Sequence, residues 1–177
     1  TLPGERVSGE AQGDRLTDIR IVSSSPERVA APCRHFKACG GCQLQHASDG
    51  FVADWKIEIV KKALAAQSLE TEFKPILTSP AQSRRRATFS VRRSKKGAMA
   101  GFHARGSDVI VQIPDCQLVH PDLTGALGIV EALAIIGGSR KGELNVTVTR
   151  SDAGLDVLVR GGKPLDGPLH VERAGAV

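Results

Sequence analysis

Four cysteines constrain this chain more than any other feature, because no other cysteine exists among its 177 residues. Three of them, Cys33, Cys39 and Cys42, follow the spacing Cys-x5-Cys-x2-Cys. The fourth, Cys116, is separated from Cys42 by 73 residues. Four thiolates suit one tetrahedral metal ion or one iron–sulfur cluster. A site that used all four would tie the first loop to a distant segment and would leave no thiol for other chemistry.

The spacing alone leaves the kind of metal site open. All-cysteine zinc sites usually pair two Cys-x2-Cys knuckles, whereas this chain has one knuckle and two isolated cysteines. Three clustered cysteines and a remote fourth are closer to iron–sulfur ligation, although the spacing differs from that of bacterial ferredoxins. We expect His35 and His46 to form loop hydrogen bonds, because four cysteines already fill a tetrahedral site. Gly40 and Gly41 allow a tight turn around a bound centre.

Hydrophobic periodicity predicts an α+β fold with a mainly antiparallel sheet, two or three helices and a cysteine-rich loop. Helical periodicity predicts helices over 54–67 and 123–136, the first capped by Asp49 or Asp54 and the second ended by Gly137 and Gly138. Two-residue alternation predicts strands over 84–93, 98–103 and 109–113, and a hairpin formed by 144–149 and 155–159. The first helix carries an apolar stripe of Trp55, Ile59, Val60, Ala63 and Leu64.

Positive charge is concentrated in one stretch of the chain. Residues 73–107 hold nine Lys or Arg residues and no Asp or Glu, while the net charge of the whole chain is only +5. In the strand over 84–93, three apolar residues share one face, namely Ala87, Phe89 and Val91. The other face is cationic and hydroxylic, with Arg84, Arg86, Thr88, Ser90 and Arg92. A solvated surface would explain such a run, but an uninterrupted basic face favours a nucleic-acid backbone, without deciding between RNA and DNA.

With these motifs the chain resembles the RNA uracil-5-methyltransferases, especially those that act on 23S ribosomal RNA. The resemblance covers roughly residues 1–160 and rests on the cysteine loop, which continues as Gln-Leu-Gln-His46, and on three further motifs. These are Arg84-Arg-Arg-Ala-Thr-Phe-Ser90, Gly101-Phe-His-Ala-Arg105 and Asp108-Val-Ile-Val-Gln-Ile-Pro-Asp-Cys116. The opening Leu2-Pro-Gly-Glu-Arg-Val7 is similar to part of the small β-barrel TRAM domain of that family. Ser83 stands where the family often has a tyrosine.

The resemblance implies that residues 1–25 are the C-terminal part of a TRAM-like, OB-like barrel and that 26–177 form a central iron–sulfur and RNA-binding domain. It implies a [4Fe-4S] cluster held by Cys33, Cys39, Cys42 and Cys116, with a structural role. The residues expected to contact RNA phosphates are Arg84, Arg86, Arg92, Lys95, Lys96 and Arg105.

In this family a following domain binds S-adenosylmethionine and supplies the cysteine nucleophile that attacks uracil. This chain shows no Gly-x-Gly loop after a strand, and its four cysteines are already assigned. We therefore expect no catalytic and no S-adenosylmethionine-binding residue here, and a fragment that is inactive alone. Its start without Met and its end at Val177 fit that expectation.

Two other functions are compatible with the same cysteines. A non-enzymatic, zinc-stapled RNA-binding module would use the same cysteines, and an electron-transfer iron–sulfur protein would use them without RNA. No signal peptide and no apolar stretch near the ~18–20 residues of a membrane span is present, so we expect a cytoplasmic monomer without membrane contact. The resemblance favours ribosomal RNA over tRNA as the partner.

Overall fold

The computed structural model describes residues 1–163 and divides the chain into two compact units. Unit 1 comprises residues 1–32 and 43–78, and unit 2 comprises the cysteine loop 33–42 and everything from residue 79 onward. Residues 164–177, which belong to the predicted domain 26–177, lie outside the described residues.

Unit 1 begins with a β-hairpin and ends with a helix and an irregular segment. Strands β1 (Arg6–Gln12) and β2 (Arg15–Ser23) pair antiparallel across a turn in which Gly13 has a φ of 62°. A positive φ of this size is accessible to glycine without a steric penalty. Two strands do not form a barrel, so the TRAM-like domain stays a prediction.

Helix α1 (Asp49–Ala65) starts five residues earlier than the periodicity predicted. Ser48 is its N-cap, because the hydroxyl oxygen of Ser48 accepts a hydrogen bond from the backbone N–H of Phe51 at 3.2 Å. The predicted caps are wrong, since Asp49 lies in the first turn instead. The apolar stripe is present, yet no residue of α1 is buried, and Trp55 and Ile59 are both more than two fifths exposed.

The carboxylate of Glu5 holds the start of unit 1 together. It accepts hydrogen bonds from the backbone N–H groups of Leu2 at 2.7 Å and Ser25 at 3.3 Å, and Nη2 of Arg28 lies 2.9 Å away. The hydrogen bond from Arg28 lowers the pKa of Glu5 from 4.5 to about 2, and the two backbone donors act in the same direction against the effect of burial. The ionised form of Glu5 is therefore part of the folded structure.

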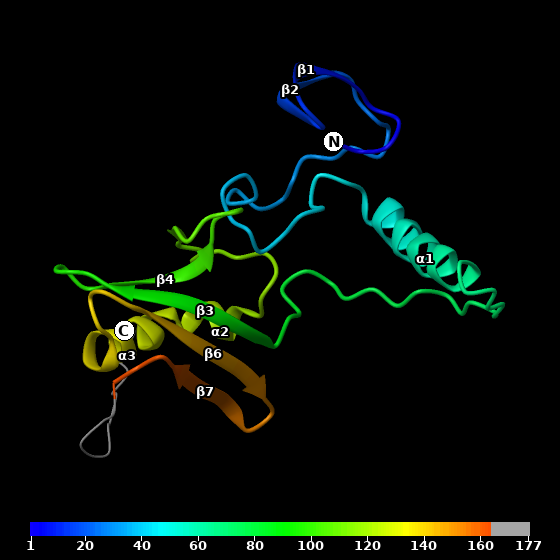
Figure 1. Ribbon diagram of the computed structural model, residues 1–177. Helices are drawn as coiled ribbons and strands as arrows, with labels where there is room; N and C mark the ends of the chain where they lie inside the picture. Colours follow the sequence, from blue (N-terminus) through cyan, green and yellow to red (C-terminus); the bar gives the residue numbers. More distant parts are fainter. Residues whose placement is uncertain (164–177) are drawn as a thin grey trace. The chain divides into compact units, whose positions relative to one another are not determined.

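Unit 2 is built on a five-stranded sheet with the order β5-β4-β3-β6-β7, in which all neighbours are antiparallel (Figure 1). The strands are β3 (Arg86–Arg93), β4 (Ala98–His103), β5 (Ile110–Val111), β6 (Glu143–Ser151) and β7 (Gly154–Arg160). The predicted hairpin of the last two strands is confirmed, and β3 pairs antiparallel with β4. The α+β class with a mainly antiparallel sheet is therefore correct.

The helical segment of unit 2 is broken into two. Helix α2 (Pro121–Gly125) and helix α3 (Leu127–Gly137) replace the single helix predicted over 123–136, and Ala126 caps both of them. Proline is favoured at the first position of α2, Pro121, because its missing N–H would have no partner at a helix start. The predicted end at Gly137 and Gly138 is confirmed, since Gly138 is extended.

One apolar layer between the helices and the sheet forms the core of unit 2. Its fully buried side chains come from β3, β6, the two helices and the segment between β5 and α2, and include Phe89, Val91, Ile113, Val119, Leu123, Val130, Val146 and Val148. The predicted inner face of β3 is thus confirmed. Ser90, predicted on the exposed face, is instead only 8% exposed. The outer face carries the pair of Thr88 and Thr147, whose hydroxyl oxygens lie 2.8 Å apart.

We predict that Val146→Ala destabilises unit 2 by about 2 kcal/mol, because two buried methyl groups are lost and a cavity remains. Its cross-strand partner Val159 is the matched control, since it is 38% exposed whereas Val146 is fully buried. Val159→Ala should change the free energy of unfolding by less than about 0.5 kcal/mol. Urea unfolding followed by far-ultraviolet circular dichroism measures both, and equal losses would contradict the assigned core.

We predict that Glu5 makes the stability of unit 1 depend on pH. Because the folded pKa of about 2 lies below the ordinary 4.5, the stabilisation is complete above pH 4.5 and is lost as the pH falls toward 2. At pH 7 the Glu5→Gln chain should have a lower urea midpoint than the native chain. Near pH 2 the two midpoints should be the same. Glu10→Gln, at an exposed position of β1, is the control and should match the native chain at both pH values.

Candidate metal and nucleic-acid sites

All four cysteines belong to unit 2, although three of them lie between two segments of unit 1 in the sequence. Cys39 and Cys116 are each 8% exposed and pack in the same core cluster, whereas Cys33 and Cys42 are partly buried. Tight turns shape the loop, with the backbone N–H of Cys39 donating to the carbonyl of His35 at 2.8 Å. The fold therefore carries the clustered cysteines and the remote one on one body.

The cysteine loop is joined to the end of β4 by backbone contacts. The N–H of Gly40 donates to the carbonyl of His103 at 2.8 Å, and Cys39 forms an isolated bridge with Ala104. A Cβ atom on Gly40 would lie 2.8 Å from the carbonyl oxygen of His103, closer than such atoms are found. Only glycine permits this approach without a shift of the backbone, which explains the first glycine of the Gly-Gly pair.

Side chains beside Cys33 contact the segment that carries Cys116. Nε2 of His35 lies 2.6 Å from Oδ1 of Asp115, and Nε of Arg34 lies 2.8 Å from the other carboxylate oxygen. The hydrogen bond with His35 lowers the pKa of Asp115, and the charge of Arg34 acts in the same direction. His35 is thus a hydrogen-bonding residue, as expected, and these contacts link the two ends of the cysteine set.

Two backbone N–H groups donate to cysteine sulfurs. Gly41 donates to Sγ of Cys39 at 3.3 Å, and Leu118 donates to Sγ of Cys116 at 3.4 Å. Hydrogen bonds of this kind accompany metal-bound cysteines and tune iron–sulfur centres. Among residues 1–163, however, no three Cys, His, Asp or Glu side chains lie in metal-ligating geometry. The donor set thus fits a thiolate-ligated centre by its chemistry, and the ligand assignment stays a prediction.

Two of the six expected RNA contacts are engaged within the protein. Nη2 of Arg92 lies 3.1 Å from Oε2 of Glu143, and Nη2 of Arg105 donates to the carbonyls of Phe36 at 3.1 Å and Cys42 at 2.8 Å. Burial favours the neutral form of Glu143, but hydrogen bonds from His103 and Ser90 and the charge of Arg92 hold its pKa below the ordinary value. These two arginines are therefore less accessible to a phosphate than their sequence positions implied.

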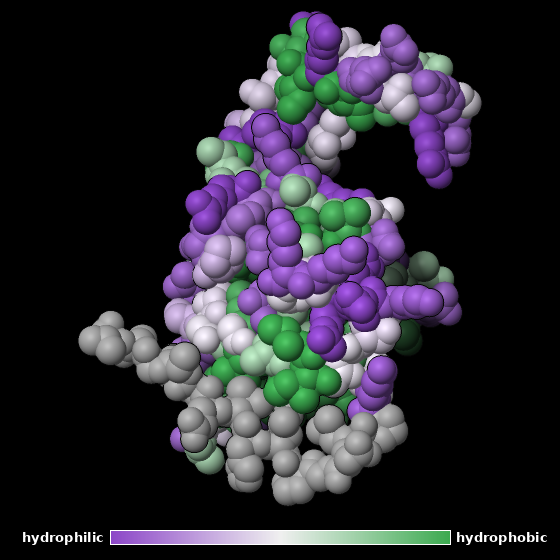
Figure 2. Space-filling view, turned by 90° about the vertical axis from the view of Figure 1, so that its left-hand side faces the viewer, coloured by the Kyte–Doolittle hydropathy of each residue, from purple (hydrophilic) through white to green (hydrophobic). Residues whose placement is uncertain are grey.

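The other four expected contacts lie exposed near the two ends of β3. Arg84 and Arg86 lie at its start, and Lys95 and Lys96 lie in the turn that follows it. Within the described residues no ion pair involves any of these four side chains. In Figure 2, hydrophilic side chains adjoin one another across the middle of the face drawn. The charges of these four basic side chains are available to a phosphate partner.

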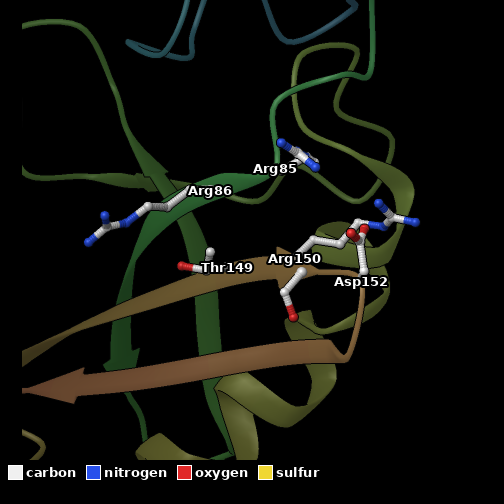
Figure 3. Close-up of a pocket in the computed structure, with 6 residues that line it drawn as sticks. Arg85, Arg86, Thr149, Arg150 and Asp152 are labelled. Atoms are coloured by element: carbon white, nitrogen blue, oxygen red, sulfur yellow. The ribbon is translucent and has the colours of Figure 1, made fainter.

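A basic pocket of about 420 Å³ lies where β3 begins and β6 ends. Its lining residues are Arg85, Arg86, Thr149, Arg150, Ser151 and Asp152 (Figure 3). The backbone N–H of Arg150 donates to the carbonyl of Arg85 at 2.7 Å, and Nε of Arg150 lies 2.7 Å from Oδ2 of Asp122. Arg150 is therefore paired with a carboxylate, and Asp152 adds a second carboxylate to the lining. Arg85 and Arg86, beside the hydroxyl groups of Thr149 and Ser151, are the guanidinium groups of this pocket that suit a phosphate.

Sequence reasoning missed two of the three arginines of this basic pocket, Arg85 and Arg150. Two-residue alternation would assign Arg85 to the inner face, but β3 begins only at Arg86, so the rule does not reach it. Arg150 comes beside the arginine run through the pairing of β3 with β6, in which Arg86 is the partner of Thr149. The uninterrupted run of three arginines was the one signal that pointed to Arg85.

Unit 1 has a pocket of different character, of about 490 Å³, against α1. Three of its lining residues are acidic, namely Glu27, Asp54 and Glu58, and its aromatic residues are Phe51 and Trp55. Such a lining disfavours phosphate. No helix within residues 1–163 has the length and apolar character needed to cross a bilayer.

Comparison with known proteins finds relatives that match nearly the whole chain. A protein of Brucella suis named as an uncharacterized RNA methyltransferase is 34% identical over 161 residues, or 91% of this chain and 39% of the relative. One of the same description from Caulobacter vibrioides is 38% identical over 177 residues, covering 97% and 42%. A 23S rRNA (uracil(1939)-C(5))-methyltransferase RlmD of Halomonas elongata is 37% identical over 134 residues, covering 71% and 28%. The chain thus spans about two fifths of the length of the first two relatives, and no family model matches it.

Proposed function

The chain is homologous to RNA methyltransferases along nearly its whole length, and from this premise we propose that it is the RNA-binding, cluster-bearing portion of an RNA uracil-5-methyltransferase. The parent enzyme takes its methyl group from S-adenosylmethionine. Residues 1–25 belong to a TRAM-like domain and residues 26–177 to the central domain. The parent enzyme is a cytoplasmic monomer. It acts on ribosomal RNA in preference to tRNA, in line with the name of the Halomonas relative.

One observation carries the RNA-binding part of the proposal. The run of Arg84, Arg85 and Arg86 has its backbone fixed on both sides, by Leu118 and His120 on one side and by Arg150 on the other. Its three side chains are exposed and, within the described residues, have no carboxylate partner. A rigid backbone that presents unpaired guanidinium groups is suited to hold phosphates, since little order is lost on binding.

The cysteine set supports the cluster part of the proposal. Cys33, Cys39, Cys42 and Cys116 would hold a [4Fe-4S] cluster, which would supply a covalent tie between the loop and the segment that precedes α2. Closing such a long stretch of chain restricts the unfolded state, so the role is structural. With all four thiols used in this way, the chain has no cysteine left to attack a uracil and transfers no methyl group alone.

We predict that the chain binds RNA with an affinity that falls as salt rises, because phosphate contacts release counterions. The double change Arg84→Ala and Arg86→Ala should weaken binding and reduce the slope of log K against log salt by about 0.7 per lost contact. Fluorescence anisotropy with a labelled single-stranded RNA measures both.

Arg160→Ala, which removes a charge from an exposed position of β7, is the matched control and should leave affinity and slope unchanged. Arg92→Ala should weaken binding less than the double change does, because the charge of Arg92 is already paired with Glu143. An affinity that is independent of salt would overturn the phosphate-binding surface.

We predict that Cys116→Ser removes most of the bound iron after anaerobic reconstitution with iron and sulfide, because one of four cluster ligands is lost. Elemental analysis measures the iron and zinc bound to the chain, and visible absorbance measures the cluster. Gln112→Ala, an exposed change nearby, should keep the iron. Full iron in the Cys116→Ser chain would refute the ligand set, and colourless protein with zinc would favour the zinc-stapled module instead.

A further inference from the structure

Arg105 lies in the tight turn that follows β4 and reaches back across the cysteine loop. The turn is closed by the N–H of Ala104, which donates to the carbonyl of Val109 at 2.8 Å. Gly106 has a φ of 61° there, a backbone conformation that glycine adopts freely. The turn thus fixes the direction in which the Arg105 side chain leaves the backbone.

Four hydrogen bonds connect Arg105 to the loop. Its backbone N–H donates to the carbonyl of Ala38 at 3.3 Å, and its Nε donates to the carbonyl of Cys39 at 3.4 Å. Its Nη2 donates to the carbonyls of Phe36 at 3.1 Å and Cys42 at 2.8 Å. The guanidinium carbon also lies 4.6 Å from the centre of the Phe36 ring, within the range of a cation–π contact.

These bonds fix the peptide groups that carry the ligands. The peptide group between Cys39 and Gly40 is held from both sides, since its carbonyl accepts from Arg105 and its N–H donates to the carbonyl of His103. With this peptide fixed, the next N–H, that of Gly41, is free to donate to Sγ of Cys39. One planar guanidinium thereby sets the orientation of carbonyls at both ends of the Cys-x2-Cys knuckle.

We propose that Arg105 is a positioning residue that orders the cysteine loop, rather than a phosphate contact. The loop-ordering role stands on the geometry above, whereas its importance for a metal rests on the proposed function. A lysine does not replace Arg105, because a single ammonium on a long stem lacks the planar fork that spans three carbonyls.

The test measures how fast each cysteine of the metal-free full chain reacts with iodoacetamide, resolved by mass spectrometry of its peptides. In the Arg105→Ala chain, Cys39 and Cys42 should react on the order of tenfold faster, because loss of several hydrogen bonds lets the loop open more often. Cys116 should keep its rate, since its own turn and the N–H of Leu118 hold it. Arg105→Lys should resemble Arg105→Ala, and Arg160→Ala, with the same loss of charge, should resemble the native chain.

Three results would overturn the proposal. They are native rates at Cys39 and Cys42 in the Arg105→Ala chain, an equal acceleration at Cys116 that marks global unfolding, and native rates in the Arg105→Lys chain. Iron uptake on reconstitution is the second readout, and the Arg105→Ala chain should retain less iron than the Arg160→Ala chain. If the native chain itself takes up no iron, the proposed cluster fails, while the alkylation rates still decide the role of Arg105.

Discussion

The close approach of the cysteine loop to the end of β4 is the contact on which the candidate metal site depends. Gly40 reaches the carbonyl of His103 at a distance that excludes any larger residue. Because this contact fixes Cys39 beside Ala104, it joins to the sheet of unit 2 a loop that lies between two segments of unit 1 in the sequence. The sheet in turn positions the segment of Cys116, through Ile113 and Val119 in its core. A metal site divided between two distant parts of a chain requires such a fixed framework.

The same sheet divides the basic residues into two groups with different uses. Where β3 runs beside β6, Arg92 faces Glu143 across the pair and is neutralised there. At the start of β3, the facing residues are Thr149 and Arg150, and no ion pair within residues 1–163 involves Arg85 or Arg86. Cross-strand partners thus decide which arginines stabilise the fold and which remain available to a phosphate.

The secondary structure was predictable where one signal acted alone. Two-residue alternation located β3, β4 and β6, because burial on one face imposes that pattern. It also located β7, although no residue of β7 is buried. The break between α2 and α3 was not predictable, since an uninterrupted apolar pattern runs through Ala126. For α1 the periodicity correctly predicted a helix, but it did not predict burial, since no residue of α1 is buried.

The amino-acid sequence alone establishes the chemical inventory: four thiols, one run of arginines and a pair of glycines at a turn. It also determined the strands, since local alternation and the residues at turns are properties of neighbours in the chain. Which basic residues already have hydrogen-bond or ion-pair partners within the protein depends on the fold, because those partners lie far away in the sequence. Arg105 is the clearest example, for its position in a basic stretch suggested a phosphate contact, whereas the fold directs it to carbonyls more than sixty residues earlier.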